Sequence, residues 1–234
     1  MPWLPAISRA VVGAAAVLLL AWLVAPQLRT LLLASTVSQL DISVSQVLHG
    51  SFGPFSVTLM QAVSLLHSTA ALLTYAALGA LALWHTGRRG AAALLLMVLP
   101  GGMLLNFAVK TVVQRARPVW GYAYQAVQGF SFPSGHTAGA TLLYGLLVFA
   151  LWPRALRLPQ AHAARQRLAM LLLPCVAAAM VLLVAVSRIV LGVHFFSDCV
   201  AGVLEALVWL CICLAGGPSA AAVMTAPRNG ARAA

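Results

Sequence analysis

The sequence predicts an all-α fold, a polytopic membrane bundle of six transmembrane helices. Hydrophobic residues make up 62% of the chain and charged residues only 7%, whereas an ordinary soluble domain has roughly 25% charged residues. The mean hydropathy of +0.98 is equally unusual for a soluble protein. Several apolar runs approach the roughly 20 residues that a helix needs to cross a bilayer. Because lipid offers no hydrogen bonds to the backbone, these runs are expected to be helical.

Six apolar runs are candidate spans. They cover Ile7–Ala25, Leu66–Trp84, Ala91–Val109, Thr137–Trp152, Leu168–Val186 and Val200–Leu214. The fourth run is short for a full crossing, so we expect its helix to continue into polar residues at one end. Arg9 and the first run together resemble a secretory signal. The length of the run and the following Pro26 argue against cleavage, so we keep it as the first span.

The segment between the first two spans has a weaker pattern. Leu40–His49 and Phe55–Val63 alternate apolar and polar residues at roughly helical spacing, and Gly50 and Gly53-Pro54 interrupt them. Glycine and proline at such places favour breaks between short elements. We therefore predict two interfacial helices that lie on the membrane.

The spans and this segment form one predicted domain over residues 1–215. Its amino-terminal part, 1–65, holds the first span and the interfacial segment, and its core, 66–215, holds the other spans. Residues 216–234 are rich in Gly, Ala, Pro and Arg and lack apolar residues for a core. This tail is predicted to be disordered.

The basic residues indicate the orientation of the spans. A net charge of +11 would suit a nucleic-acid partner, but the arginines lie in short clusters between apolar runs without interleaved exposed aromatics, so we exclude that partner. Cytoplasmic loops carry an excess of Lys and Arg. The residues that we assign to that side are Arg9, Arg88, Arg89, Arg154, Arg157, Arg165, Arg167, Arg228 and Arg232. Both termini are then cytoplasmic, in a bacterial inner membrane.

Three polar segments fall at the opposite, extracytoplasmic ends of the spans. In the first, Lys110 and Arg117 are seven residues apart, about two helical turns, so they would project from one helix face until Pro118 ends the helix. Two cations on one face suit an anion. The alternative is that they only extend to lipid headgroups. Arg115 would add to the positive field without touching the anion.

The second segment is Pro133–His136, at the start of the fourth span. Free N–H groups and the dipole at a helix N-terminus favour an anion, and Gly135 lets it approach the backbone closely. The alternative is that Ser134 only caps the helix.

The third segment is Ser187–Asp198, in which His194 and Asp198 are spaced i to i+4. On a helix the carboxylate could hold one ring nitrogen and leave the other free as a nucleophile. Arg188 is off that face in a straight helix, and Gly192 offers a place for a bend. The alternative is a purely structural His–Asp pair.

The chain has few candidate metal ligands. Its acidic residues are Asp41, Asp198 and Glu205, and its cysteines, all within or beside apolar runs, are Cys175, Cys199, Cys211 and Cys213. A two-metal phosphatase needs a cluster of carboxylate or histidine ligands, which these residues do not supply. We expect the cysteines to be small packing residues and Glu205 to form a buried helix–helix hydrogen bond.

Together the three segments resemble the type 2 phosphatidic acid phosphatase superfamily. The family pattern is K-x-x-x-x-x-x-R-P, then P-S-G-H, then S-R-x-x-x-x-x-H-x-x-x-D. The matching residues are Lys110, Arg117-Pro118, Pro133-Ser134-Gly135-His136, Ser187-Arg188, His194 and Asp198. Every position of the pattern is met, and the order of the segments agrees.

The resemblance implies a mechanism. His194 would attack phosphorus and form a phosphohistidine, Asp198 would orient its ring, and His136 would act as general acid. The residues implied for binding the phosphate are Lys110, Arg117, Ser134, Gly135 and Arg188. No metal and no cofactor are implied, and the partner is a phosphorylated lipid in the bilayer.

Other functions stay open. The protein could bind or transport a phosphorylated lipid without cleaving it, or resemble a vanadium haloperoxidase, in which vanadate occupies the phosphate position. Among lipid substrates, undecaprenyl pyrophosphate, phosphatidylglycerol phosphate and phosphatidic acid all fit a site with three cations. The outward-facing site and compact chain favour undecaprenyl pyrophosphate.

Overall fold

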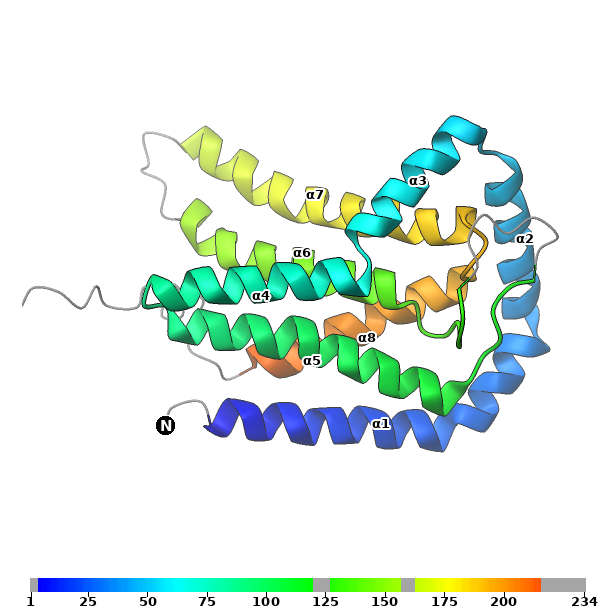
Figure 1. Ribbon diagram of the computed structural model, residues 1–234, viewed down its shortest axis with the longest axis horizontal. Helices are drawn as coiled ribbons and strands as arrows, with labels where there is room; N and C mark the ends of the chain where they lie inside the picture. Colours follow the sequence, from blue (N-terminus) through cyan, green and yellow to red (C-terminus); the bar gives the residue numbers. More distant parts are fainter. Residues whose placement is uncertain (1–3, 120–126, 157–162, 216–234) are drawn as a thin grey trace, which may run out of the picture.

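The structure, a computed structural model, describes residues 4–119, 127–156 and 163–215 and is all-helical over them (Figure 1). Its helices are α1 (Leu4–Leu33), α2 (Thr36–Gly50), α3 (Pro54–Leu66), α4 (Thr69–His85), α5 (Arg89–Val113), α6 (Gly135–Leu156), α7 (Ala163–Val190) and α8 (Phe196–Leu214). Five of them are long and apolar enough to span a membrane, and α3 with α4 forms a sixth, bent candidate. The predicted fold class is confirmed. The tail 216–234 lies outside the described residues.

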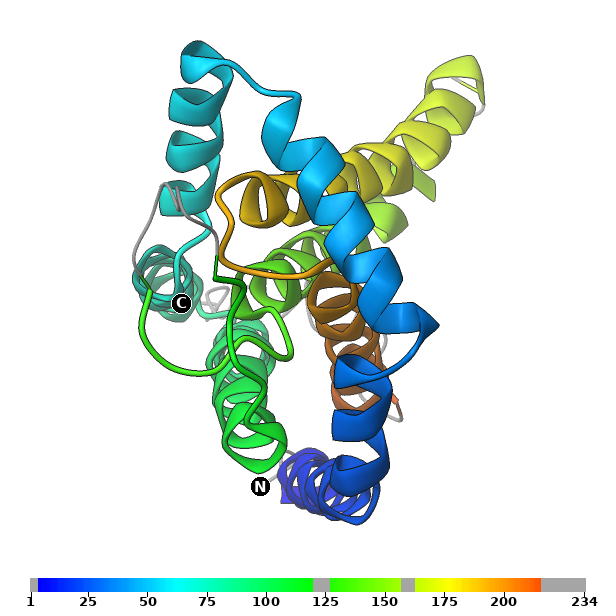
Figure 2. The ribbon, with the colours of Figure 1, turned by 90° about the vertical axis from the view of Figure 1, so that its right-hand side faces the viewer.

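The spanning helices run in alternating directions along the long axis of the bundle, which is horizontal in Figure 1. The start of α1 and the end of α8 lie at one end. The connections from α5 to α6 and from α7 to α8, which carry the sequence motifs, reach the other end. Figure 2 looks onto that end and shows α2 crossing it. The three polar segments are therefore gathered at the end of the bundle that α2 crosses.

The observed boundaries extend most predicted spans. The first helix continues through Pro26 to Leu33. The fourth span begins at Gly135 and includes His136 in its first turn, so the expected continuation into polar residues is confirmed. The predicted span Leu66–Trp84 is interrupted near its start, because α3 ends at Leu66 and α4 begins at Thr69.

The predicted helix Phe55–Val63 lies within α3, and its position on the membrane surface stays a prediction. Helices α3 and α4 are together long and apolar enough for a span, with a bend of 44° between them. One face of α3 packs on α7 and buries Val57, Met60, Val63 and Ser64. The sequence pattern was amphipathic because one face of α3 meets protein and the other does not.

Helix α6 is central and packs on α4, α5, α7 and α8. Small residues allow these helices to approach closely, which is how membrane helices pack without a hydrophobic driving force between them. A Cβ on Gly202 of α8 would lie 2.6 Å from the backbone oxygen of Ser134. A Cβ on Gly102 of α5 would lie 2.8 Å from the ring of Trp209. The α6–α8 contact therefore occurs where the second motif begins.

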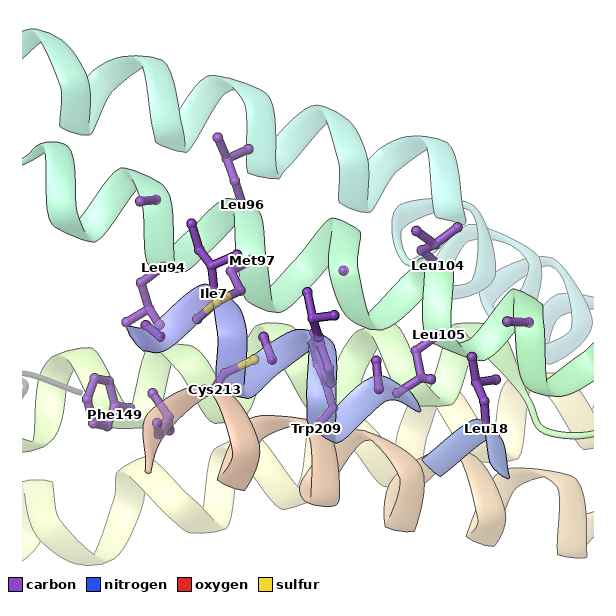
Figure 3. Close-up of a pocket in the computed structure, with 18 residues that line it drawn as sticks. Ile7, Leu18, Leu94, Leu96, Met97, Leu104, Leu105, Phe149, Trp209 and Cys213 are labelled. Atoms are coloured by element: carbon purple, nitrogen blue, oxygen red, sulfur yellow. The ribbon is translucent and has the colours of Figure 1, made fainter. Parts of the chain in front are cut away.

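An apolar groove of about 510 Å³ lies between α1, α5 and α8 (Figure 3). Its lining includes Leu18, Met97, Leu105 and Trp209, and contains no acidic, basic or histidine residue. The indole N–H of Trp209 already donates to the carbonyl of Val98 at 3.1 Å. This groove therefore offers contact to apolar chains but no charged or imidazole group.

The close approach at Gly202 predicts a specific loss of stability. Gly202→Ala should lower the free energy of unfolding by about 1–3 kcal/mol, because the added methyl group meets backbone that cannot rotate away. The matched control is Gly145→Ala in the same helix pair, whose Cβ would meet only the end of the flexible Leu210 side chain, at 2.6 Å. Thermal unfolding in detergent measures both variants. Equal losses would contradict the prediction.

Candidate active site

The structure brings the predicted site residues together. The electrostatic neighbours of His136 include Arg188, His194 and Lys110, and those of Lys110 include Arg117 and Asp198. The remaining predicted residues are Ser134, whose N–H donates to the backbone oxygen of Asp198 at 2.8 Å, and Gly135, beside it at the start of α6. Segments far apart in the sequence thus form one cluster of basic and imidazole groups.

The third motif forms a turn rather than one continuous helix. Helix α7 ends at Val190, Gly192 adopts a φ of +72°, and α8 begins only at Phe196. The prediction that His194 and Asp198 share a helix is therefore wrong, because His194 precedes α8. The side chains nevertheless meet, with His194 Nδ1 3.4 Å from Asp198 Oδ2. Asp198 also caps α8 by accepting from the N–H of Phe195 at 3.0 Å.

His194 is held with one ring nitrogen facing a cation. Its Nε2 lies 3.3 Å from Nη1 of Arg117. A guanidinium only donates hydrogen bonds, so Nε2 accepts and the ring proton is on Nδ1, toward Asp198. Burial lowers the pKa of His194 to about 3, although the hydrogen bond to Asp198 opposes this shift. The imidazole is therefore neutral at pH 7 and has a lone pair on Nε2.

Arg117 reaches this position from outside the helix. Helix α5 ends at Val113, where Gln114 takes a left-handed conformation with φ of 56°. The prediction of one helical face through Lys110 and Arg117 is wrong for this reason. The Arg117 side chain instead donates to the carbonyls of Gly129 at 3.1 Å and Val193 at 2.8 Å.

Lys110, the only lysine of the chain, lies in the last turn of α5 and holds the segment before α6. Its Nζ donates to the carbonyls of Phe130 at 3.4 Å, Ser131 at 3.2 Å and Pro133. An ammonium has three protons to donate. In this structure Lys110 therefore fixes the second motif relative to the first.

The start of α6 is tightly enclosed. Ser134 is fully buried, and its Oγ accepts from the backbone N–H of Thr137 at 3.5 Å and from Thr137 Oγ1 at 3.0 Å. The bond from the backbone N–H is the capping role that the sequence left open. A Cβ on Gly135 would lie 3.0 Å from Asn106 Oδ1. A side chain at this position would require Asn106 on α5 to shift.

Arg188 has a hydrogen-bond partner that lies outside the three motifs. It lies in the last turn of α7, is only 1% exposed, and donates through Nη1 to Ser64 Oγ on α3. Near this bond, His67 Nε2 contacts the hydroxyl of Tyr144 at 2.9 Å. The bent α3–α4 pair thus forms one wall of the site.

Arg115 and Asp41 were missed as site residues. Arg115 forms ion pairs with Asp198 at 2.6 Å and with Asp41 at 2.7 Å, and all three side chains are at least 95% buried. The expectation that Arg115 only adds to the positive field is therefore incomplete. A sequence signal existed, because a lone carboxylate in so apolar a chain needs a buried partner.

The expected helix–helix hydrogen bond of Glu205 is confirmed, since its Oε2 accepts from Asn106 Nδ2 at 2.6 Å. Among the described residues, His, Cys, Asp and Glu side chains form no group of three that could hold a metal ion. Of the cysteines, Cys199 and Cys213 are buried, and Cys175 and Cys211 face outward.

The contacts of Lys110 predict local order in the second motif. Lys110→Met should expose the amides of Ser131 and Ser134 to hydrogen exchange at least about tenfold faster, because the segment loses its charged hydrogen bonds. The control is Arg29→Met, which removes hydrogen bonds to the carbonyls of Val112 and Val113 instead. Exchange measured by mass spectrometry tests this. Unchanged protection in Lys110→Met would refute the assigned contacts.

Comparisons with known proteins agree with this arrangement. Residues 90–219, more than half of the chain, match the model of the PAP2 superfamily. Phosphatidylglycerophosphatase B of Bacillus subtilis (strain 168) is 31% identical over 109 residues, which cover 47% of this chain and 49% of that relative. The chain thus matches about half of that relative's length.

A solved structure shares the fold. It is a transmembrane PAP2-type phosphatidylglycerolphosphate phosphatase from Bacillus subtilis, superposed with a TM-score of 0.66 over 84% of this chain and 92% of that one, at 24% identity. That structure is described as transmembrane, and this chain has several helices long and apolar enough to span a membrane, so it is a multi-pass membrane protein. With the match over residues 90–219, it follows that the chain belongs to the PAP2 superfamily.

Proposed function

We propose that this protein is an integral membrane lipid phosphatase that hydrolyses a phosphate monoester or pyrophosphate of a lipid through a phosphohistidine. The observation that carries the proposal is the neutral His194 ring, with Nδ1 toward Asp198 and Nε2 toward Arg117. Such a ring is oriented, desolvated and neutral, with a lone pair on the nitrogen that faces Arg117. We assign the activity to a single domain over residues 1–215.

In the first step, His194 Nε2 attacks phosphorus in line. A P–N bond forms while the P–O bond to the lipid breaks, and His136 donates a proton to the departing oxygen. Asp198 accepts the hydrogen bond from Nδ1 and stabilises the positive charge that develops on the ring. Lys110, Arg117 and Arg188 stabilise the negative phosphoryl oxygens, together with Ser134 and the Gly135 amide.

In the second step, water attacks phosphorus and the P–N bond breaks. His136, now neutral, takes a proton from this water, and the electron pair returns to His194 Nε2. Inorganic phosphate leaves and the starting protonation states are restored. The chain's own cations supply the charge stabilisation, and two of its three carboxylates, Asp41 and Asp198, are already paired with Arg115. This pairing supports a mechanism without metal or cofactor.

The substrate we place first is phosphatidylglycerol phosphate. The names of the curated relative and of the solved structure both refer to phosphatases of this lipid, which favours it over undecaprenyl pyrophosphate and phosphatidic acid. A lipid substrate also suits the position of the site, where the headgroup could reach the cations while the acyl chains stay in the bilayer.

We further propose that the site faces the periplasm of a bacterial inner membrane and that both termini are cytoplasmic. The support is the excess of basic residues near the other end of the bundle, such as Arg88 and Arg89 at the start of α5. The start of α1 and the end of α8 also share that end (Figure 1).

The activity is tested by phosphate release from purified protein in detergent with a chelator present. We expect release from phosphatidylglycerol phosphate and a loss of at least about 10³-fold in His194→Ala, since removing a nucleophile leaves only residual catalysis. The control is His85→Ala, an exposed histidine at the opposite end. Undecaprenyl pyrophosphate, phosphatidic acid and a short-chain soluble ester are assayed in parallel.

Several outcomes would oppose the proposal. Binding of the lipid by folded protein without release of phosphate would favour a binding or transport protein. Peroxidase activity with vanadate and no phosphatase activity would favour the haloperoxidase alternative. Equal rates with the short-chain ester would remove the support for a membrane substrate.

The orientation predicts the behaviour of reporter fusions. A green fluorescent protein fused to the carboxyl terminus should fluoresce in bacteria, because it folds in the cytoplasm, and a matched alkaline phosphatase fusion should be inactive. The reverse result would place the site on the cytoplasmic side.

A further inference from the structure

Helix α2, outside the sequence motifs, sends one carboxylate into the site. Asp41 is 1% exposed and accepts from Arg115 Nη2 at 2.7 Å. It also accepts from the backbone N–H of Ser197 at 2.8 Å and from Ser197 Oγ at 2.5 Å. Ser197 directly precedes Asp198, so α2 is joined to the start of α8.

The two carboxylate oxygens of Asp198 have different partners, and Arg115 contacts Oδ1. Its Nη1 donates to Oδ1 of Asp198 at 2.6 Å, and Oδ2 accepts from the N–H of Phe195 and faces His194. Arg115 is itself fixed by the carbonyl of Leu32 at 3.1 Å and lies 4.2 Å from the Phe195 ring centre. The carboxylate of Asp198 therefore has one orientation, with Oδ2 toward the imidazole.

The net charge of this cluster also affects His194. An arginine that paired only with Asp198 would cancel the negative charge that His194 sees. Asp41 contributes a second carboxylate to the same guanidinium, so the cluster of Asp41, Arg115 and Asp198 carries one net negative charge. That charge favours the positive ring that forms when His194 bonds to phosphorus.

We propose that Asp41 and Arg115 are positioning residues that set the orientation and effective charge of Asp198, and through it the reactivity of His194. Neither residue touches the substrate. The proposal rests on the phosphatase function proposed above, and it gives α2 a role in that function. It predicts that their loss slows the chemical step while substrate binding is retained.

The first test is Asp41→Asn, which keeps the shape of the side chain and removes its charge. We expect kcat for phosphatidylglycerol phosphate to fall roughly 10- to 100-fold, the usual effect of losing a residue that orients a reacting group indirectly. KM should change by less than about threefold, because the contacts that bind the substrate equally well in the ground state and in the transition state are unchanged. Asp41→Glu, which keeps the charge, should retain more kcat than Asp41→Asn.

The second test is non-additivity. If Asp41 acts through Asp198, then Asp41→Asn should cost less than about twofold in kcat when Asp198→Asn is already present. Arg115→Lys should be less active than wild type, because an ammonium cannot bridge two carboxylates in the geometry of a guanidinium. A purely structural role would instead lower kcat by the same factor in both backgrounds.

Two controls separate chemistry from folding. Ser45→Ala changes another buried residue of α2, and Arg29→Gln removes another arginine that joins α1 to the end of α5. Both should keep wild-type kcat, and the melting temperature of every variant is measured in detergent. If these controls lost as much kcat as Asp41→Asn, the effect would be a general loss of structural stability and the proposal would be overturned.

The outcomes distinguish this proposal from the proposed function. Wild-type protein without lipid phosphatase activity would refute the function itself. Active wild type, with Asp41→Asn at full kcat or with equal losses in Asp41→Asn and Asp41→Glu, would refute only the positioning role. A raised KM with unchanged kcat would also refute it and would place Asp41 in substrate binding.

Discussion

The buried carboxylate of Asp198 is the group on which the site depends. It is fully buried, and a charge in that position is stable only when its hydrogen bonds are satisfied. Its side chain meets Arg115, His194 and the N–H of Phe195, and its backbone oxygen accepts from Ser134. One residue thus connects the ends of α6, α7 and α8 with the segment that follows α5. The three side-chain contacts also provide the hydrogen bonds that the buried charge requires.

Close backbone approach makes these connections possible. In a membrane, helices associate through packing and interhelical hydrogen bonds, because lipid is as apolar as their side chains. Gly202 lets α8 pass against the backbone of Ser134, and Gly135 lets α6 pass against Asn106. The Asn106–Glu205 hydrogen bond adds a polar contact between α5 and α8. The first turn of α6 is therefore fixed from two sides before any substrate binds.

The sequence predicted the spans and the identity of the clustered residues, because apolar length and motif spacing are local signals. It failed where the geometry depends on backbone breaks. The left-handed Gln114 takes Arg117 off α5, and the turn at Gly192 takes His194 off α8. The sequence indicated that a lone carboxylate needs a buried partner, but it did not identify which residue that partner is. The pairing of Asp41 with Arg115 joins positions 74 residues apart, and no periodicity reports that α2 crosses the end of the bundle.

The cations of the site already have partners, and this affects how an anion would bind. Lys110 donates to neutral carbonyls before α6, and Arg117 donates to the carbonyls of Gly129 and Val193. These bonds hold the partly buried charged groups in place through neutral acceptors. Hydrogen bonds from a cation to an ionised oxygen are roughly twice as strong as those between neutral groups. A phosphoryl group entering the site would exchange neutral acceptors for charged ones, so binding is favoured even though every donor must first leave a partner. These side chains are already ordered near the site before a substrate arrives, so binding exchanges their acceptors instead of ordering mobile groups, and this reduces the reorganisation that electrostatic stabilisation of a transition state requires.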